Sequence, residues 1–336
     1  MTILNLMLGK GRGGLEQAGA DYADALAHAA IPTLTITHPD AWVNASLTGV
    51  PHITLKHFAS WDPFAILRLR RIAKETNATA VICHGNRALR MALTALKGRV
   101  PIIAVAHNYS INRFVKADHV FCITRDLIEE MVHRDFPRAQ ITHMPNMVRI
   151  PTIAPRTPFR SPPVIATMGR FVEKKAFDLY IDAIHLLKER GIQFKAILGG
   201  DGAEAPLLKE RANGLEDVLT FSGWVKDKDQ FFHGADIFVL PSHHEPFGIV
   251  LIEAMAYKVP CVTTDSEGPC EIVHPNKDAL LTRRGNATEM ADALEELITD
   301  ETKAKALAAE AFTLVSSTYS IDAMASRLKT ALKSLS

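Results

Sequence analysis

The sequence predicts an α/β protein made of two open, mainly parallel sheets covered by helices. Short β-branched runs alternate with helix-like runs in both halves of the chain, which is typical of strand–helix–strand units. A proline-rich stretch separates the halves, and 336 residues suffice for about two domains. Hydrophobic residues make up 47% and charged residues 22% of the chain, so a disordered or fibrous protein is excluded.

The first half contains runs with the composition of strands at 2–8, 33–37, 79–84, 101–107, 119–124 and 140–145. Amphipathic stretches near 15–29, 62–76, 86–97 and 124–134 predict the helices between them. Residues 145–163 then carry six prolines without sustained periodicity. This stretch indicates a linker, because proline fixes φ and lacks an amide donor.

The pattern restarts in the second half, with strand-like runs at 164–169, 194–200, 218–223, 236–242 and 259–264. From about residue 286 to residue 335 the sequence predicts helices only. We therefore expect a Rossmann-like domain over 1–150 and a second one over 151–336, with its sheet within 163–320 and a helical tail. The two domains would face each other across a central cleft, with ligands beyond the carboxyl ends of the strands.

The composition also bears on the compartment. The chain has no run of 18 apolar residues, and its N-terminus lacks the features of a signal peptide. The cysteines show no C-x-x-C spacing, and three of the four lie in or beside strand-like runs. We therefore expect buried free thiols and a cytoplasmic protein.

Charge is unevenly distributed along the chain. Residues 1–150 hold 17 Lys and Arg against 11 Asp and Glu, whereas residues 151–336 hold 21 against 26. The first half is therefore expected to bind an anionic partner. The basic excess is too weak, and too poor in interleaved aromatic residues, to indicate nucleic acid.

Residues 9–14 (GKGRGG) form a G-x-G-x-x-G pattern between the first strand and the first helix. This is the pattern of a dinucleotide-binding loop, with Asp40 as the ribose-binding acid. Gly13 and Gly14, however, stand at the helix start, where backbone amides can approach any phosphate. The pattern predicts a phosphate loop and leaves open a dinucleotide, another phosphate, or a tight turn without a ligand.

The second half places charged residues where ligands bind in such sheets. Arg170 ends a strand and Lys175 precedes a helix, an arrangement that suits a diphosphate or a solvated basic turn. Glu245 and Glu253 flank Gly248, where a helix is expected to begin. Two carboxylates in this position favour recognition of vicinal sugar hydroxyls over a solvated helix face.

These motifs stand in a recognisable order. Gly169-Arg170 with Lys175, GGDG at 199–202, FSG at 221–223, PSHHEPFGIVLIEAMA at 241–256 and SEGPCEIV at 266–273 together resemble glycosyltransferase family 4. The resemblance covers nearly all of the second domain and implies a GT-B fold and a retaining, nucleotide-sugar-dependent transferase. In the first half, GRGGLEQ resembles the family's glycine-rich loop and PIIAVAHN its strand ending in histidine. Bacterial enzymes that build lipopolysaccharide core or other cell-surface glycans are similar to this chain.

The resemblance implies roles for single residues. Glu253 would bind ribose hydroxyls, Glu245 the donor sugar, and Arg170 with Lys175 the diphosphate, while His107 would lie beside the sugar. The implied catalytic residues are His107, Arg170, Lys175 and Glu245. The remaining implied donor-binding positions are Gly13, Gly14, Gly169, Gly200, Val225, Pro246, Phe247, Gly248 and Ile249.

We expect neither a metal nor a cofactor, because fixed cations and helix N-termini can stabilise the leaving diphosphate. The pair His243-His244 lacks the second cluster that a metal site needs. Lys258 stands where the family usually has glycine. We expect this difference to affect the turn before a strand and not the reaction.

Two further features have more than one interpretation. His84 ends a strand and either contacts the acceptor or serves as a core or capping residue. The helix expected at 62–75 either lies on anionic lipid headgroups or packs on its domain with a charged outer face. The cations concerned are Arg68, Arg70, Arg71, Lys74, Arg87, Arg90, Lys97 and Arg99.

The expected function is transfer of a hexose-type sugar from a UDP-, GDP- or ADP-sugar to a hydroxyl of a lipopolysaccharide-core or other cell-surface glycan or glycolipid acceptor. We expect this reaction at the inner face of the cell membrane. Three alternatives remain at this point. A GT-B relative would epimerise or hydrolyse its nucleotide sugar. An NAD(P)-dependent Rossmann oxidoreductase would use residues 9–14 but leave the second-half motifs unexplained. A two-domain sugar-binding protein would perform no chemistry.

Overall fold

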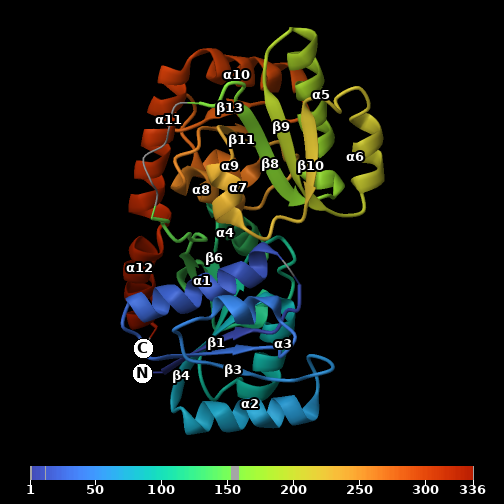
Figure 1. The fold of residues 1–336 in the computed structure, drawn as a ribbon. Helices are drawn as coiled ribbons and strands as arrows, with labels where there is room; N and C mark the ends of the chain where they lie inside the picture. Colours follow the sequence, from blue (N-terminus) through green and yellow to red (C-terminus); the bar gives the residue numbers. More distant parts are fainter. Residues whose placement is uncertain (1, 12, 153–158, 336) are drawn as a thin grey trace. The chain divides into compact units, whose positions relative to one another are not determined.

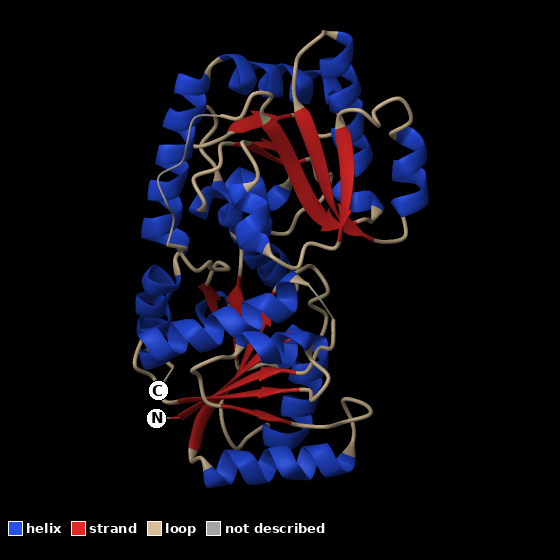
Figure 2. Cartoon of the chain, in the orientation of Figure 1, coloured by secondary structure: helices blue, strands red, loops and turns tan. Residues whose placement is uncertain are grey.

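The structure is a computed structural model that describes residues 2–11, 13–152 and 159–335 (Figure 1). It divides into two compact units, one of residues 1–147 with 319–336 and one of residues 148–318. Each unit is built on a parallel sheet with helices packed around it (Figure 2). The predicted class of two parallel-sheet α/β domains is confirmed. The predicted cleft between them stays a prediction.

The first unit contains a seven-stranded parallel sheet in the order β3-β2-β1-β4-β5-β6-β7. Its strands are β1 (Thr2–Met7), β2 (Thr33–Thr37), β3 (His52–Thr54), β4 (Ala78–His84), β5 (Ile102–Ala106), β6 (His119–Cys122) and β7 (Ile141–His143). Its helices are α1 (Gly14–His28), α2 (Pro63–Glu75), α3 (Gly85–Leu96), α4 (Arg125–His133) and α12 (Ile321–Lys333). The predicted strands and helices of this half are present, and only β3 was not predicted.

The second unit contains a six-stranded parallel sheet in the order β10-β9-β8-β11-β12-β13. Its strands are β8 (Val164–Arg170), β9 (Lys195–Asp201), β10 (Leu219–Gly223), β11 (Ile237–Leu240), β12 (Cys261–Thr264) and β13 (Leu280–Thr282). Its helices are α5 (Phe177–Glu189), α6 (Ala205–Arg211), α7 (Lys228–His233), α8 (Ile249–Ala256), α9 (Glu267–Ile272), α10 (Ala287–Thr299) and α11 (Glu301–Leu314). Here β13 is the strand that sequence reasoning missed.

The central strands are buried on both faces, which explains why they were predictable. Every residue of β5 and of β11 is buried, and both read as continuous apolar runs, IIAVA and IFVL. Helices cover both faces of a parallel sheet, so such strands lack a polar side. The carboxyl ends of all strands in a parallel sheet lie at one edge, and the loops that follow them gather there.

The helical tail departs from the prediction. Residues 319–336 were expected to belong to the second domain, but they belong to the first unit. The reason is a stripe of apolar residues on α12, including Met324, Leu328 and Leu332, which is buried as α12 packs against α1. An ion pair between His28 Nδ1 and Asp322 Oδ1, 2.6 Å apart, joins the same two helices.

Lys258 lies in the turn between α8 and β12, as expected from the sequence. It follows α8 with φ of +55°, in the left-handed region that favours glycine. Its Nζ lies 4.4 Å from the centroid of the Phe312 ring on α11. A cation–π contact of this kind offsets part of the backbone strain.

Among the cysteines, Cys83, Cys122 and Cys261 are buried, as predicted, whereas Cys270 is exposed.

Candidate active site

Two paired glycines lie near the carboxyl ends of strands β8 and β9 in the second sheet. Gly169 pairs in register with Gly200, and Arg170 with Asp201. Gly200 has φ of +138°, and a Cβ atom there would overlap the carbonyl oxygen of Gly169. Only glycine fits this close approach. The end of β8 thereby presents Arg170, which is exposed.

Lys175 reaches Glu245 across this edge. The chain after β8 makes a 3₁₀ turn over Glu173–Lys175, and Ala176 then adopts φ of +49° to enter α5. Lys175 Nζ forms an ion pair with a carboxylate oxygen of Glu245, whose side chain is only 9% exposed. The structure thus joins two of the predicted catalytic residues. Burying a carboxylate is costly unless it is paired and hydrogen-bonded, and Lys175 provides such a partner.

Glu253 was predicted to lie about one and a half turns into a helix, and the structure agrees. Gly248, with φ of +103°, is the N-cap of α8, and Glu253 is the fifth residue of that helix. Its carboxylate Oε1 lies 2.5 Å from Lys228 Nζ on α7. Sequence reasoning missed Lys228, because nothing local in the sequence signals a partner 25 residues away.

A third carboxylate supports the loop that carries Glu245. Glu267 accepts hydrogen bonds from the Glu245 backbone amide at 3.2 Å, from His244 Nδ1 at 3.1 Å and from Arg284 at 3.0 Å. Burial alone would raise the pKa of Glu267, but hydrogen bonds from backbone amides and His244 outweigh it and hold that pKa below its ordinary value. Glu267 therefore remains an anion that orients this loop.

Gly268 fixes the same loop sterically. Its amide donates to the Glu245 carbonyl at 2.8 Å, and a Cβ atom on it would overlap the carbonyl oxygen of Phe247. Glycine in the motif SEGP thus allows the backbone at Gly268 to pack directly against the backbone of Phe247, which holds Pro246 and Phe247 in place.

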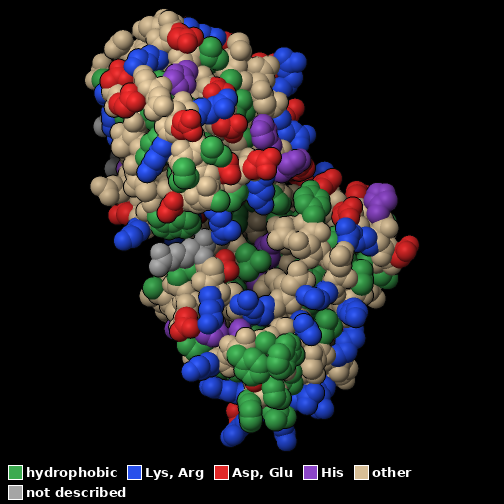
Figure 3. Space-filling model, turned by 90° about the vertical axis from the view of Figure 1, so that its right-hand side faces the viewer, with side chains coloured by type: hydrophobic (Ala, Val, Ile, Leu, Met, Phe, Trp, Pro, Cys, Tyr) green, Lys and Arg blue, Asp and Glu red, His purple; other side chains and the backbone are tan. Residues whose placement is uncertain are grey.

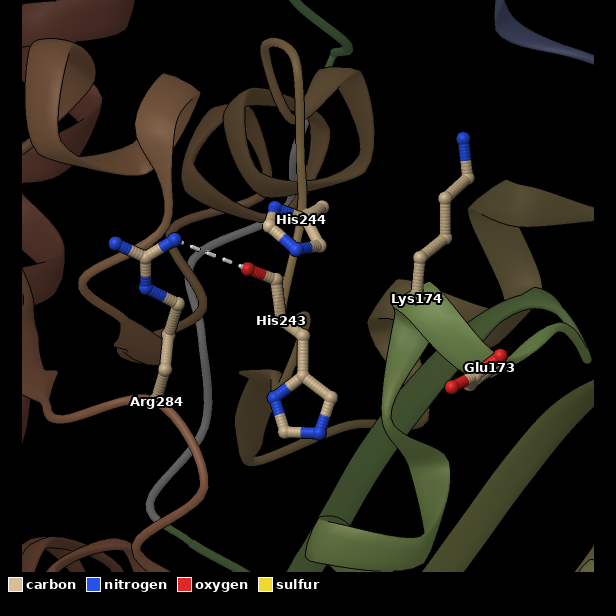
Figure 4. A pocket seen from close by; sticks show the side chains of 5 residues that line it. All are labelled: Glu173, Lys174, His243, His244 and Arg284. Atoms are coloured by element: carbon tan, nitrogen blue, oxygen red, sulfur yellow. Dashed lines mark hydrogen bonds between the residues drawn. The ribbon is translucent and has the colours of Figure 1, made fainter.

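A pocket of about 470 Å³ lies beside this loop (Figure 4). Its lining consists of Glu173, Lys174, His243, His244 and Arg284. Arg284 donates to the His243 carbonyl oxygen at 3.3 Å, which links the loops that follow β11 and β13. None of the predicted site residues lines this pocket, although Lys174 and His244 adjoin Lys175 and Glu245 in sequence.

Val225 lies at the carboxyl end of β9. A Cβ atom on Gly199 would lie 2.6 Å from Val225 Cγ2, so Val225 packs directly over the end of β9. The second unit therefore gathers Gly169, Arg170, Lys175, Gly200, Val225, Pro246, Phe247, Gly248, Ile249, Glu245 and Glu253 at one edge of its sheet.

No metal cluster is formed within residues 2–11, 13–152 and 159–335, where His, Cys, Asp and Glu side chains do not gather in threes. Asp227 and Asp229, which flank Lys228 in sequence, have other partners. Asp227 caps α7 by accepting from the Gln230 amide at 2.9 Å, and Asp229 binds the hydroxyl of Tyr257.

The glycine-rich loop of the first unit leads into α1. Gly13 is the N-cap, in an extended conformation with no side-chain cap, and Gly14 is the first helical residue. A Cβ atom on Gly9 would overlap the Glu16 carboxylate. Asp40, the ribose-binding acid of the dinucleotide alternative, instead pairs with Lys10 at 3.1 Å. Arg12 lies outside the described residues.

His107 and His84 lie at the carboxyl edge of the first sheet. His84 Nδ1 is 3.0 Å from His107 Nε2, and His84 Nε2 is 2.8 Å from Asn5 Oδ1. Burial, and secondarily the neighbouring His107, lower the pKa of His84 well below its ordinary value. Burial lowers the pKa of His107 to about 4. His84 is 2% exposed with both ring nitrogens engaged, which favours its interpretation as a core residue over direct acceptor contact.

Two parallel-sheet domains, with glycine-rich turns and charged side chains at their carboxyl edges, define the class of the protein as GT-B. A model of glycosyltransferase family 4 matches residues 12–152, and a model of glycosyl transferases group 1 matches residues 151–313. The chain therefore belongs to the glycosyltransferases of these families and is an enzyme of the transferase class.

Individual relatives agree with this assignment. The chain is 27% identical over 311 residues to "Lipopolysaccharide core biosynthesis glycosyltransferase LpsE" of Rhizobium meliloti, covering 89% of each chain. It is 27% identical over 241 residues to "Lipopolysaccharide core biosynthesis glycosyltransferase LpsD" of the same organism, covering 69% of this chain and 68% of the relative. The crystal structure of Anabaena Alr3699/HepE in complex with UDP-glucose superposes with a TM-score of 0.84 at 22% identity, over 99% of this chain and 100% of the other.

Proposed function

We propose that this glycosyltransferase moves a hexose-type sugar, with retention of anomeric configuration and without a metal or cofactor, from a nucleoside diphosphate sugar to a hydroxyl of a lipopolysaccharide-core or similar glycan. One observation carries the proposal. Two glutamates, each with a lysine partner, stand with Arg170 at the carboxyl edge of a single sheet. This edge is where ligands of open α/β sheets bind.

The chemistry assigns each group a task. The bond between sugar and diphosphate breaks with the electron pair passing to the phosphate oxygen, so negative charge grows on the leaving group. Arg170 and Lys175 supply fixed positive charge for that oxygen, and the N-terminus of α8 adds its dipole. Glu253 accepts hydrogen bonds from ribose hydroxyls, and Glu245 from hydroxyls of the donor sugar.

The relatives support the substrate classes. Two bear names of lipopolysaccharide core biosynthesis, and the Anabaena structure holds UDP-glucose. We extend both to this chain as part of the proposal: a nucleotide sugar as donor and a core-type glycan as acceptor.

A thermal-shift screen of UDP-, GDP- and ADP-sugars tests the donor class. We expect one nucleotide to raise the melting temperature, and its free diphosphate to reproduce the shift. Transfer to a core oligosaccharide is then followed in buffer with and without EDTA, and NMR of the product gives the anomeric configuration. Unchanged rates in EDTA and a retained anomer are the expected results.

The same assays separate the alternatives. Donor turnover that does not depend on an acceptor would support an epimerase or hydrolase. Tight binding of a nicotinamide, with no response to any nucleotide sugar, would support an oxidoreductase. Binding of a free sugar without any turnover would support a sugar-binding protein.

We further propose that the enzyme works at an anionic membrane surface, through an exposed stripe here called the α2 surface. Its apolar members are Phe58, Trp61, Phe64 and Leu67, which are 68%, 55%, 80% and 59% exposed. Its basic members, Arg68 and Lys74, are exposed further along the same helix. Figure 3 displays a cluster of hydrophobic side chains with Lys and Arg side chains close to it on this face of the molecule.

Phe64, Leu67, Arg68 and Lys74 recur at helical spacing, so one face of α2 is apolar at its start and basic at its end, and Phe58 and Trp61 precede the helix. Asp62 starts the helix by accepting from the Phe64 and Ala65 amides at 3.0 and 3.2 Å. Large exposed apolar side chains beside cations suit an interface of acyl chains and anionic headgroups. None of the helices in the described residues combines the length and apolar content needed to cross a membrane.

Not all predicted lipid-facing cations belong to this surface. Arg70 donates to the carbonyls of Ala95 and Thr94 at 2.9 and 3.0 Å, and so caps α3. Lys97 pairs with Asp118 at 3.1 Å. Both side chains therefore make contacts within the domain, although Lys97 remains exposed.

Co-sedimentation with vesicles tests the α2 surface. We expect binding to phosphatidylglycerol-containing vesicles and none to pure phosphatidylcholine. The double variant Phe64→Ser/Leu67→Ser should weaken binding at least tenfold, as should Arg68→Glu/Lys74→Glu. Leu207→Ser is the matched control, since Leu207 is 61% exposed on α6 of the other unit. Equal binding by all variants, or by both vesicle types, would overturn this proposal.

A further inference from the structure

A chain of buried polar side chains crosses the first sheet and ends at His107. Asn5 on β1 lies between Gly19 of α1 and His84 of β4, and His84 lies between Asn5 and His107. Asn5 is fully buried and His84 nearly so. Polar groups so placed need complementary partners, because an unmatched donor or acceptor in the interior is costly.

The donor–acceptor direction of the hydrogen bonds in this series of side chains follows from one backbone carbonyl. Asn5 Nδ2 lies 2.8 Å from the Gly19 carbonyl oxygen, which can only accept. The amide nitrogen of Asn5 must therefore face Gly19, and Asn5 Oδ1 must face His84. Thr35 Oγ1, 3.3 Å from the same Asn5 nitrogen, is compatible with this orientation because a hydroxyl can accept.

The orientation of Asn5 then determines the proton positions on both histidines. Asn5 Oδ1 can only accept, so His84 Nε2 must carry a proton and donate it. A neutral His84 has a lone pair on Nδ1, so His107 Nε2 must be the donor across the 3.0 Å contact. Burial disfavours a second proton on His84. In every hydrogen bond of this series, the donor is therefore on the His107 side and the acceptor on the Gly19 side.

His107 Nδ1 is left with a lone pair. It is buried and has no hydrogen-bond partner among the described residues, and the same holds for Asn146 Oδ1. Hydrogen bonding to the Asn146 side chain raises the pKa of His107 against the larger lowering by burial, so the two side chains adjoin. A lone pair on Nδ1 can receive a hydrogen bond but cannot give one.

We propose that Asn5 and His84 are positioning residues that hold His107 in the tautomer protonated on Nε2, so that Nδ1 serves only as a hydrogen-bond acceptor. Any group that comes to face Nδ1 must then donate a hydrogen bond, as a hydroxyl or an amide can and the oxygens of a phosphate, which offer no hydrogen, cannot. That the donor is a sugar hydroxyl rests on the proposed function. The tautomer itself does not.

Nitrogen-15 NMR of the histidine rings at pH 7 tests the tautomer directly, with His107→Gln to identify the signal. In the wild-type protein we expect a protonated Nε2 and an unprotonated Nδ1 on His107. A proton on Nδ1, or a doubly protonated ring, would overturn the proposal. This measurement needs no variant that endangers folding.

Two substitutions of His84 separate positioning from packing. His84→Gln can preserve the direction of the chain, since its carbonyl accepts from His107 and its amide donates to Asn5. His84→Leu cannot. We expect Gln to keep the His107 tautomer and Leu to release it into a mixture, with KM for the donor raised about tenfold in the Leu variant and rescued by Gln. An unchanged tautomer in the Leu variant would refute the proposal.

His119→Leu is the matched control, because His119 is another buried histidine on β6, bonded to Thr142 at 2.8 Å outside this chain. It should leave the His107 tautomer unchanged. If the tautomer follows the expected pattern while no nucleotide sugar is ever turned over, the proposed function fails and the positioning of His107 stands.

Discussion

Lys228 Nζ on α7 lies 2.5 Å from Oε1 of Glu253 on α8, so the carboxylate assigned to the ribose already has a cationic partner. The lysine balances the charge of this buried side chain and leaves its second oxygen for a ligand. An ionised acceptor forms stronger hydrogen bonds than a neutral one.

Glu253→Ala should therefore weaken binding of the free nucleoside diphosphate about 10- to 100-fold, the range for hydrogen bonds to a charged group. Isothermal titration calorimetry provides the measurement. Glu189→Ala, an exposed glutamate at the end of α5, is the control and should bind normally. Equal affinity in both variants would remove Glu253 from the nucleotide site.

Arg170→Ala and Lys175→Ala should each lower kcat by about 100- to 1,000-fold, as expected when charge stabilisation of a leaving group is lost. Steady-state rates with the accepted donor provide the test. If both variants kept wild-type turnover with every accepted donor, the diphosphate assignment would be wrong.

The same two cations should differ in their effect on stability. Lys175→Ala leaves the buried Glu245 carboxylate without its ion-pair partner, so the melting temperature should fall. Arg170 is exposed, and Arg170→Ala should leave the melting temperature nearly unchanged. The double variant Lys175→Ala/Glu245→Gln should recover stability but not activity. Recovery of both would show that the ion pair is purely structural.

Gly268→Ala should lower the free energy of unfolding by about 2 kcal/mol or more, because the new Cβ would overlap the Phe247 carbonyl. It should also reduce activity by displacing Glu245. Gly98→Ala is a matched control: Gly98 has φ of +74° but open space around it, so only about 1 kcal/mol of backbone strain is expected. Urea unfolding compares the two, and equal losses would contradict the steric explanation.

The lowered pKa of His107 predicts a pH-dependent stability. The folded pKa is about 4 and the unfolded value is about 6.5, so between them the unfolded chain binds more protons. The contribution is therefore complete above about pH 6.5 and is lost as the pH falls towards 4, by at most about 3 kcal/mol.

Urea unfolding at pH 7.5 and pH 5.0 checks this sign. Wild-type stability should fall towards pH 5.0, and His107→Gln should fall less. Some dependence should remain in that variant, because burial lowers the pKa of His84 in the same direction. His52→Gln, which removes an exposed histidine, should behave as wild type. A steeper fall in His107→Gln than in wild type would reverse the assigned direction.

The order of elements was predictable because both sheets are parallel and buried. Such strands appear as continuous apolar runs bounded by glycine and proline, and amphipathic stretches between them are helices. The strands β3 and β13 escaped notice because each has only three residues. The tail was assigned to the wrong unit because an apolar stripe shows that a helix packs, but not against what.

The sequence alone determined the class of fold, the family, and which residues stand at strand ends where chemistry is expected. Tertiary structure decided which charges meet: Lys175 with Glu245, Lys228 with Glu253, and His84 with Asn5 at a sequence separation of 79 residues. Local periodicity records the buried face of an element, because burial acts on each residue separately. Ion pairs and proton positions depend on which distant strand or helix lies opposite, and only folding of the whole unit brings those partners together.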